Sequence, residues 1–370
     1  MTSALLLEVA GLKKFYPLGR GSFLHAVDGV DLSLESGETV GLVGESGCGK
    51  STLARLITRL IDPTAGSIRF AGDEIGATSA QRFGRSALRA QIQMVFQDAT
   101  DCLNPRFTAF RAIADPLRRM RRLGGAALRD RVVEVARLAG LPAELLGRFA
   151  HQLSGGQKAR VGIARAIAVE PHLLILDEPT AALDVSVQVV ILQLLDELRR
   201  RLGLSYLFVS HDLNVVRLLC DRILVMYLGR IVESGPAHRV FGSPAHPYTE
   251  ALLSAVPNRD GTARDRRIAL PGEPRSPIDP DPNVCPLSGR CNRAEEMCQR
   301  AMPALREIAP GRRAACHFPI PKAASRRATR RLNEQRAHYV SPAKAPATAM
   351  RSGSRSAGAR SVTPNGRPSG

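Results

Sequence analysis

No apolar run in this sequence approaches the roughly 18 residues that a membrane-spanning helix needs, which excludes a chain that crosses the bilayer by such a helix. The first eight residues lack a basic start and a sustained apolar core, so they do not form a signal peptide. Tryptophan is absent and aromatic residues make up only 4% of the chain, but a hydrophobic content of 44% is normal for a globular protein. We therefore expect a cytosolic protein that reaches a membrane only through its partners.

Acidic residues are almost missing from one end of the chain. Residues 321–370 carry eleven Lys and Arg against Glu334 alone, a net charge of +10 out of +18 for all 370 residues. The segment is rich in Ala, Ser, Pro and Gly and poor in large apolar side chains, so it cannot bury enough surface to fold. We expect a disordered basic tail and no nucleic-acid partner. Weak contact with anionic lipid or nucleic acid is the alternative interpretation.

A glycine-rich loop stands between an apolar run, residues 39–43, and a helical pattern that continues from Thr52. This strand–loop–helix context is typical of a loop whose backbone N–H groups wrap around phosphate. Lys50 would bring a charge to the outer phosphates, and Ser51 would offer its hydroxyl to Mg²⁺. The predicted nucleotide-binding residues here are Gly44, Glu45, Ser46, Gly47, Cys48, Gly49, Lys50, Ser51 and Thr52.

Two acidic residues end another apolar run, residues 173–176. Asp177 would hold Mg²⁺, directly or through water, and Glu178 would orient the attacking water, because phosphoryl transfer depends mainly on positioning and charge. The alternative is a pair of solvated acids that cap a strand.

The segment Leu-Ser-Gly-Gly-Gln at residues 153–157 follows the glycine-rich loop by about a hundred residues. With both motifs the chain resembles the ATP-binding cassette (ABC) family, which implies an α/β fold with a RecA-like core and a helical subdomain, and ATP and Mg²⁺ as cofactors. The resemblance assigns sensing of Mg²⁺ and water to Gln97, contact with the γ-phosphate to His211, and stacking on adenine to Tyr16, with Phe15 as the neighbouring alternative. The expected catalytic residues are Lys50, Gln97, Glu178 and His211, and the expected Mg²⁺ ligands are Ser51, Gln97 and Asp177.

The Leu-Ser-Gly-Gly-Gln segment also predicts how the chain assembles with another subunit. Ser154 is a good N-cap for a helix expected over residues 158–169. In the family, the residues matching Ser154, Gly156 and Gln157 face the γ-phosphate held by another subunit. One glycine-rich loop and one such signature resemble half of a two-site sandwich. The family usually continues with Arg-Gln-Arg, whereas Lys-Ala-Arg stands at residues 158–160.

We expect three regions along the chain. Residues 5–242 would form the cassette, with the helical subdomain at about 98–153. Residues 243–320 would form a small C-terminal extension that carries four cysteines, and residues 321–370 would form the tail.

The extension narrows the resemblance. Residues 243–253 and 270–280 resemble segments that follow the cassette in ATPases of the dipeptide, oligopeptide and nickel importers, and the likeness covers about residues 5–319. The loop with Cys48 and residues 221–229 look more like the second, F-type subunit. This implies an ATP-hydrolysing subunit that energises import of peptides or related solutes, held peripherally at the cytoplasmic face of the inner membrane. The implied partners are a paralogous D-type ATPase, two membrane permeases and a solute-binding protein.

Four of the seven cysteines fall in the extension with the spacing C-x5-C-x6-C-x17-C; they are Cys285, Cys291, Cys298 and Cys316. In a cytosolic protein such clustering favours metal over disulfides, and four thiolates hold either zinc or an iron–sulfur cluster. The first spacing lacks the short arms of structural zinc sites, and the family resemblance implies a [4Fe–4S] cluster, so we rank the cluster ahead of zinc and both ahead of free thiols.

Other functions stay open at this point. A cassette subunit of a carbon–phosphorus bond-cleaving complex, a soluble ABC ATPase that acts on ribosomes or DNA, and an exporter ATPase share the cassette motifs. The importer-type extension argues against all three.

Overall fold

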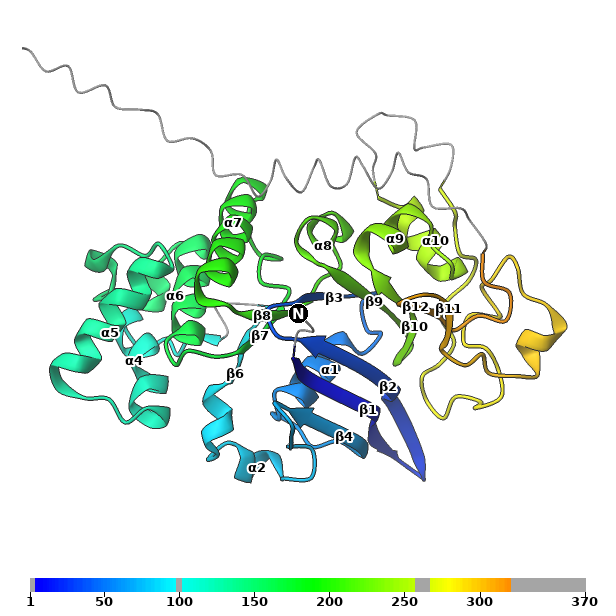
Figure 1. Ribbon diagram of the computed structural model, residues 1–370, viewed down its shortest axis with the longest axis horizontal. Coiled ribbons are helices and arrows are strands. Elements are labelled where there is room, and N and C mark those ends of the chain that lie inside the picture. Colours follow the sequence, from blue (N-terminus) through cyan, green and yellow to red (C-terminus); the bar gives the residue numbers. More distant parts are fainter. Residues whose placement is uncertain (1–3, 98–101, 257–266, 321–370) are drawn as a thin grey trace, which may run out of the picture. The chain divides into compact units, whose positions relative to one another are not determined.

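The computed structural model describes residues 4–97, 102–256 and 267–320, which belong to one unit of the chain. The tail predicted at residues 321–370 lies outside these ranges. In the described part, the strands form two sheets, and helices pack around the larger one (Figure 1). No helix among these residues is long and apolar enough to span a bilayer.

The smaller sheet is antiparallel and has the strand order β2-β1-β4-β5. Its inward positions are apolar: Leu7, Val9 and Leu12 are almost fully buried, while the residues between them are more exposed. One face of this sheet therefore covers the core. The strands are β1 Leu5–Gly19, β2 Ser22–Glu35, β4 Ala65–Phe70 and β5 Asp73–Glu74.

The larger sheet has the order β11-β12-β10-β9-β3-β8-β7-β6. Its parallel strands are β3 Thr39–Val43, β6 Ile92–Val95, β7 Leu173–Asp177, β8 Ser205–Val209 and β9 Arg222–Tyr227. Three antiparallel strands continue it: β10 Arg230–Pro236, β11 Arg306–Ala309 and β12 Arg312–Ala314.

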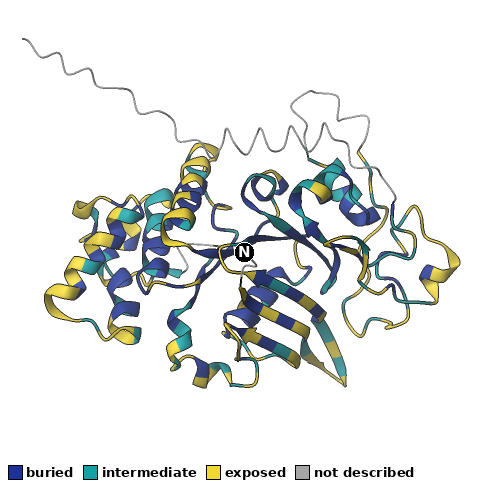
Figure 2. Cartoon of the chain, in the orientation of Figure 1, coloured by how far each residue is buried: buried dark blue, intermediate teal, exposed yellow. Residues whose placement is uncertain are grey.

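Both faces of the parallel strands are buried, which explains why these strands are continuous apolar runs. Leu173 and Ile175 of β7 join the core beneath the small sheet, whereas Leu174 and Leu176 join the core on the helical face. Figure 2 shows the strands of the large sheet as buried and much of the surface of α4 and α5 as exposed.

Helices cover the two faces of the large sheet. Helix α1 lies between the sheets and contacts β2, β7 and β8, while α6, α8 and α9 pack on β6, β3 and β9. The α-helices are α1 Lys50–Ile57, α2 Ala80–Phe83, α4 Ala109–Met120, α5 Gly125–Leu138, α6 Gly155–Ile167, α7 Val185–Leu202, α8 Leu213–Leu219, α9 Ala237–Gly242 and α10 Pro247–Ser254. The short 3₁₀ helices are η1 Ala87–Ala90, η2 Ala143–Leu145, η3 Ala150–Gln152 and η5 Glu296–Gln299.

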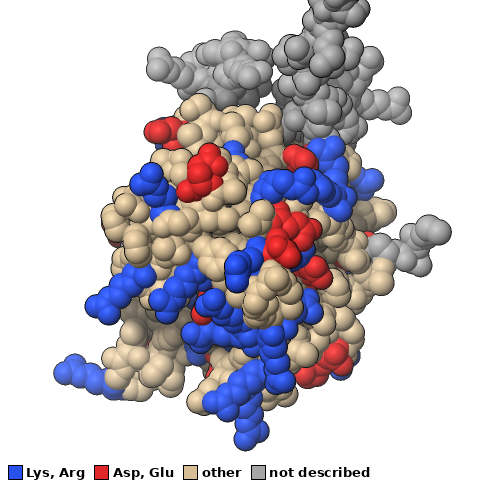
Figure 3. Space-filling view, turned by 90° about the vertical axis from the view of Figure 1, so that its left-hand side faces the viewer, with Lys and Arg blue, Asp and Glu red and all other residues tan. Residues whose placement is uncertain are grey.

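Helices α4, α5 and α6 pack against one another beside β6, within and next to the range expected for a helical subdomain. Residues 102–153 contain ten Arg against four Asp and Glu. Figure 3 shows many Lys and Arg side chains on the side of the molecule that carries these helices. The α/β fold class with a helical insertion is therefore as the sequence predicts.

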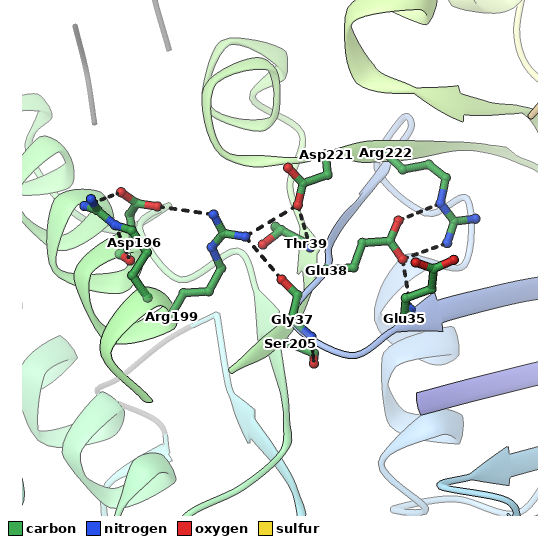
Figure 4. A network of polar contacts seen from close by, with 10 residues as sticks. Glu35, Gly37, Glu38, Thr39, Asp196, Arg199, Ser205, Asp221 and Arg222 are labelled. Carbon is green, nitrogen blue, oxygen red and sulfur yellow. Dashed lines mark hydrogen bonds and ion pairs between the residues drawn. The ribbon is translucent and has the colours of Figure 1, made fainter. Parts of the chain in front are cut away.

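A polar network lies at the amino ends of β3, β8 and β9, the opposite edge of the sheet from the glycine-rich loop (Figure 4). Asp221 accepts hydrogen bonds from the Thr39 backbone at 3.0 Å and from Arg199 at 3.5 Å. Arg222 binds Glu38 at 2.8 Å. The network ties the β2–β3 turn to the end of α7 and the start of β9.

The C-terminal extension adds its own strands to the large sheet, because β12 pairs with β10. Glu233 of β10 is fully buried and binds Arg312 at 2.8 Å. The same carboxylate accepts the backbone N–H groups of Ala245 and His246, each at 2.9 Å. These contacts join the extension to the core sheet of the cassette.

Candidate functional site

A pocket of about 600 Å³ lies at the carboxyl ends of the parallel strands. It brings together predicted site residues from well-separated segments: Tyr16, Ser46, Gly47, Gly49, Lys50, Ser51, Thr52, Gln97, Glu178 and His211. This is the edge of an open α/β sheet where ligands normally bind. The volume suits a nucleotide-sized molecule.

The glycine-rich loop wraps closely around its lysine. The Lys50 ammonium donates to the backbone oxygens of Gly44 and Glu45, each at 2.9 Å. Gly49 begins α1 with φ +106°, and a Cβ there would collide with the backbone oxygen of Ala26. Glycine is therefore required at this position both by conformation and by space.

The two carboxylates at the end of β7 have separate partners: Asp177 is its last residue and Glu178 follows it. Asp177 accepts a hydrogen bond from the Ser51 hydroxyl at 3.2 Å. Burial raises the pKa of Asp177, and the Ser51 hydrogen bond offsets part of that rise. An oxygen-rich pair of this kind suits Mg²⁺, so Ser51 and Asp177 could hold the ion expected at this site.

Glu178 contacts two of the other predicted catalytic residues, Gln97 and His211. One of its oxygens accepts a hydrogen bond from the Gln97 amide at 3.1 Å and lies 3.1 Å from Nδ1 of His211. The Glu178 side chain is only 14% exposed, and its backbone has φ +47°, which non-glycine residues rarely adopt. A residue held in such a conformation beside a ligand pocket is typical of a catalytic position.

The structure also distinguishes the two neighbouring aromatic residues. The ring of Phe15 stacks on the His25 ring with centroids 3.8 Å apart, and Phe15 does not line the pocket. Tyr16 does line it, with the Lys14 ammonium 5.0 Å from its ring. Tyr16 is therefore the aromatic residue available to a base.

Cys48 lies under the loop rather than in the pocket. It is buried, and burial raises the pKa of its thiol. A buried thiol with a raised pKa is a poor nucleophile, so Cys48 acts as a small packing residue.

The signature residues do not line this pocket. Ser154 caps α6, its hydroxyl accepting from the Gln157 backbone at 3.3 Å while the Gln157 side chain accepts from the Ser154 backbone at 2.9 Å. Ser154 is exposed and Gly156 and Gln157 are partly exposed. The start of α6 thus lies at the exposed surface of the described chain.

Sequence reasoning missed the wall of the pocket that comes from elsewhere in the chain. Leu24, His25, Ala26, Leu228, Gly229 and Pro277 also line it. Pro277 belongs to the extension: its backbone oxygen accepts from the His25 N–H at 2.9 Å, and Leu24 pairs with Ile278. No local motif predicts a contact between segments so far apart in sequence.

The four cysteines of the extension line one cavity of about 20 Å³, together with His246 and His317. Burial raises the pKa of Cys285 to about 11, and burial also raises the pKa of Cys291 and Cys316. The donor set suits a thiolate-bound centre, but in the described part of the chain no three His, Cys, Asp or Glu side chains converge as metal ligands. The predicted iron–sulfur or zinc site is thus supported by the kind of residue and not by the placement of the sulfur atoms.

Comparisons with known proteins identify the family of this chain. The profile of the ABC transporter family matches residues 27–181, and that of the oligopeptide/dipeptide transporter C-terminal region matches residues 232–298. The chain is 44% identical to the oligopeptide transport ATP-binding protein AppF of Bacillus subtilis, over 85% of this chain and 97% of that protein. The chain belongs to the ATP-binding proteins of this ABC transporter family. It is also 42% identical to the dipeptide transport ATP-binding protein DppF of Haemophilus influenzae, over 84% of this chain and 96% of that protein.

Solved structures show the same cassette fold. The ATP-binding cassette MJ0796, solved as a dimer in a post-hydrolysis state with ADP and Pi, matches with a TM-score of 0.58 and 31% identity, over 63% of this chain and 99% of that one. CbiO1 of Clostridium perfringens, part of a CbiONQ transporter complex, matches with a TM-score of 0.56 and 32% identity, over 64% of this chain and 90% of that one. This ABC ATPase therefore has the predicted fold. The relatives named as peptide transport proteins and the match to the oligopeptide/dipeptide transporter region do not favour the carbon–phosphorus and soluble alternatives.

Proposed function

We propose that this ABC ATPase hydrolyses ATP to energise the import of peptides or related small solutes. The observation that carries the chemistry is the Glu178 carboxylate, placed between Gln97 and His211 at the mouth of the phosphate-binding loop. The importer class rests on the match of residues 232–298 to the oligopeptide/dipeptide transporter region and on relatives named as peptide import proteins.

Each residue at the pocket has a role in this proposal. The loop N–H groups and Lys50 bind the phosphates, and Tyr16 stacks on the base. Ser51, Gln97 and Asp177 would hold Mg²⁺, which would neutralise phosphate charge when bound. Glu178 orients and polarises the attacking water, and His211 reaches the γ-phosphate.

We propose that the working unit contains two cassettes. The capped start of α6 lies outside the pocket and is accessible, as a half-site that completes another subunit's pocket requires. The dimeric state of MJ0796 supports this arrangement. The partner is a paralogous D-type ATPase, and two permeases and a solute-binding protein complete the transporter at the cytoplasmic face of the membrane.

Reconstitution tests the assignment. The full chain is purified alone and with the D-type subunit, the permeases and the solute-binding protein, and uptake of labelled peptides and related small solutes into vesicles is measured. ATP hydrolysis should be low for the isolated chain and should rise in the complex, and uptake should require ATP. Full hydrolysis by the isolated monomer would contradict the shared site, and an active complex that takes up neither peptides nor related small solutes would contradict the importer class.

We also propose that Cys285, Cys291, Cys298 and Cys316 bind a [4Fe–4S] cluster, with zinc as the alternative. The support is four thiols around one cavity. Anaerobically prepared protein is assayed for iron, acid-labile sulfide and zinc, with Cys220→Ser as the control outside the cavity. Iron and sulfide that fall when Cys298 is replaced by Ser support the cluster, stoichiometric zinc without sulfide favours zinc, and protein free of both refutes a metal site.

A further inference from the structure

One side chain of the C-terminal extension reaches the phosphate-binding loop. Nη1 of Arg290 lies 3.2 Å from a carboxylate oxygen of Glu45 and 3.4 Å from the Tyr227 hydroxyl. The Arg290 side chain is only 11% exposed and that of Glu45 is 34% exposed. An arginine that is withdrawn from water to this extent needs its anionic partner, because an unpaired buried charge is costly.

Glu45 in turn holds the loop's lysine. Its backbone oxygen accepts from the Lys50 ammonium at 2.9 Å, and its backbone N–H donates to the Tyr248 hydroxyl at 2.8 Å. Tyr248 lies in α10, outside the cassette motifs, and its ring packs on that of Tyr227 at 4.6 Å between centroids. Two residues of the extension therefore contact Glu45: Arg290 binds its side chain, and Tyr248 binds its backbone N–H.

The turn that carries Arg290 contains residues that line the cysteine cavity. The backbone N–H of Cys285 donates to the oxygen of Cys298 at 2.9 Å, and that of Ser288 donates to Cys285 at 3.0 Å. The Arg290 N–H donates to Leu287 at 2.8 Å, and Cys291 follows directly. Because Arg290 stands inside this turn, a rearrangement of the cysteines moves the base of its side chain.

We propose that Arg290 is a positioning residue that couples the cysteine-bearing extension to the phosphate-binding loop. Through this contact, a rearrangement of the four cysteines changes the affinity of the loop for ATP. The proposal rests on the assignment of residues 44–51 as the ATP-binding loop. Arg290 touches none of the residues that act on water, so its effect falls on nucleotide binding and not on the chemical step.

The first test measures ATP binding and hydrolysis by the full chain in complex with its partner subunits. Arg290→Ala should raise the Kd and KM for ATP roughly 5- to 10-fold, the low end of usual coupling between sites, and leave kcat within about twofold. Arg290→Lys should recover part of the affinity, because it keeps the charge and loses the fork of donors. Arg300→Ala is the matched control: Arg300 also pairs with a glutamate of the extension, but both side chains are 74% exposed.

A double-mutant cycle tests the contact itself. Glu45→Gln should weaken ATP binding about as much as Arg290→Ala, and the double variant should be no weaker than either. Additive losses would mean that the two residues act independently and would overturn the proposal. Thermal unfolding of each variant identifies any that has lost its fold.

The coupling to the cysteines has a separate readout. Cys291→Ser should raise the Kd for ATP in the wild-type background and change it little in the Arg290→Ala background. An equal effect in both backgrounds would show that the cysteines do not act through Arg290.

Lys50→Ala separates the failure of this inference from that of the proposed function. If Lys50→Ala abolishes ATP binding and Arg290→Ala leaves the Kd unchanged, the inference is wrong and the ATP site stands. If Lys50→Ala binds ATP like the wild type, the assignment of the loop is wrong.

Discussion

His246 should make the stability of this protein fall steeply in mild acid. Its side chain is buried at the start of α10 beside the cysteine cavity, and Nδ1 accepts the backbone N–H of Tyr248 at 3.2 Å. Burial lowers the pKa of His246 from 6.5 to about 4, and a hydrogen bond to the Ala315 backbone opposes that shift in part. Between about pH 4 and pH 6.5 the imidazole is therefore neutral in the folded state, whereas the unfolded chain binds a proton there.

The direction and size of the change in unfolding free energy follow from the difference in proton binding between the folded and unfolded states. Above pH 6.5 both states are neutral and the full stability is present; as the pH falls from 6.5 towards 4, the unfolded state gains a proton first and stability is lost. Between neutral pH and about pH 5 the loss from this one residue is about 2 kcal/mol, and it approaches about 3 kcal/mol near pH 4.

Urea unfolding followed by far-ultraviolet circular dichroism measures this effect, since the chain has no tryptophan for fluorescence. The matched variant is His246→Asn, which keeps an N-cap acceptor for α10 and removes the titrating group. The difference in unfolding free energy between the two proteins should shift by about 2 kcal/mol between neutral pH and about pH 5. Parallel pH profiles for the wild type and His246→Asn would refute the reasoning.

Three further outcomes follow from the structure. Because burial raises the pKa of Asp177, apparent Mg²⁺ affinity in the ATPase assay should begin to fall at a higher pH than for an ordinary aspartate; no change until the pH nears 3.8 would contradict this. Arg312→Ala leaves the fully buried Glu233 without its charged partner, so urea unfolding should show a loss of about 3–5 kcal/mol, and a loss below about 1 kcal/mol would argue against the pair. Ser154→Ala should cut hydrolysis by the complex but preserve ATP binding to the same chain, and unchanged hydrolysis would count against the shared site.

The nucleotide pocket could be predicted from the sequence because its parts are local motifs. The glycine-rich loop needs glycine at Gly49, where φ is +106°, and the two acids stand at the end of a buried strand. The strand edges of a parallel sheet then bring Gln97, Glu178 and His211 together.

The extension's contribution could not be predicted in the same way. Tyr248 and Arg290 meet Glu45 from 203 and 245 residues away in sequence, and no residue pattern encodes such a contact. Strands β11 and β12 are three to four residues long and rich in arginine, so they show no alternation of apolar and polar residues that would predict a strand. They form strands because β12 pairs with β10 and β11 pairs with β12.

Several expectations stay predictions. The region boundaries at residues 242 and 320 have no independent support in the described structure, which places β12 beside β10 in one sheet. The four cysteines surround one cavity, but in the described part of the chain they do not converge as ligands, so the metal site stays a prediction.

Replacement of Glu178 by Gln tests the central claim most directly, because it keeps the shape of the side chain and removes the charge that orients water. The assembled complex is assayed for ATP binding and for hydrolysis in parallel. The account predicts ATP binding like that of the wild type and a fall in turnover of about 100-fold or more. Hydrolysis at the wild-type rate by Glu178→Gln would contradict it.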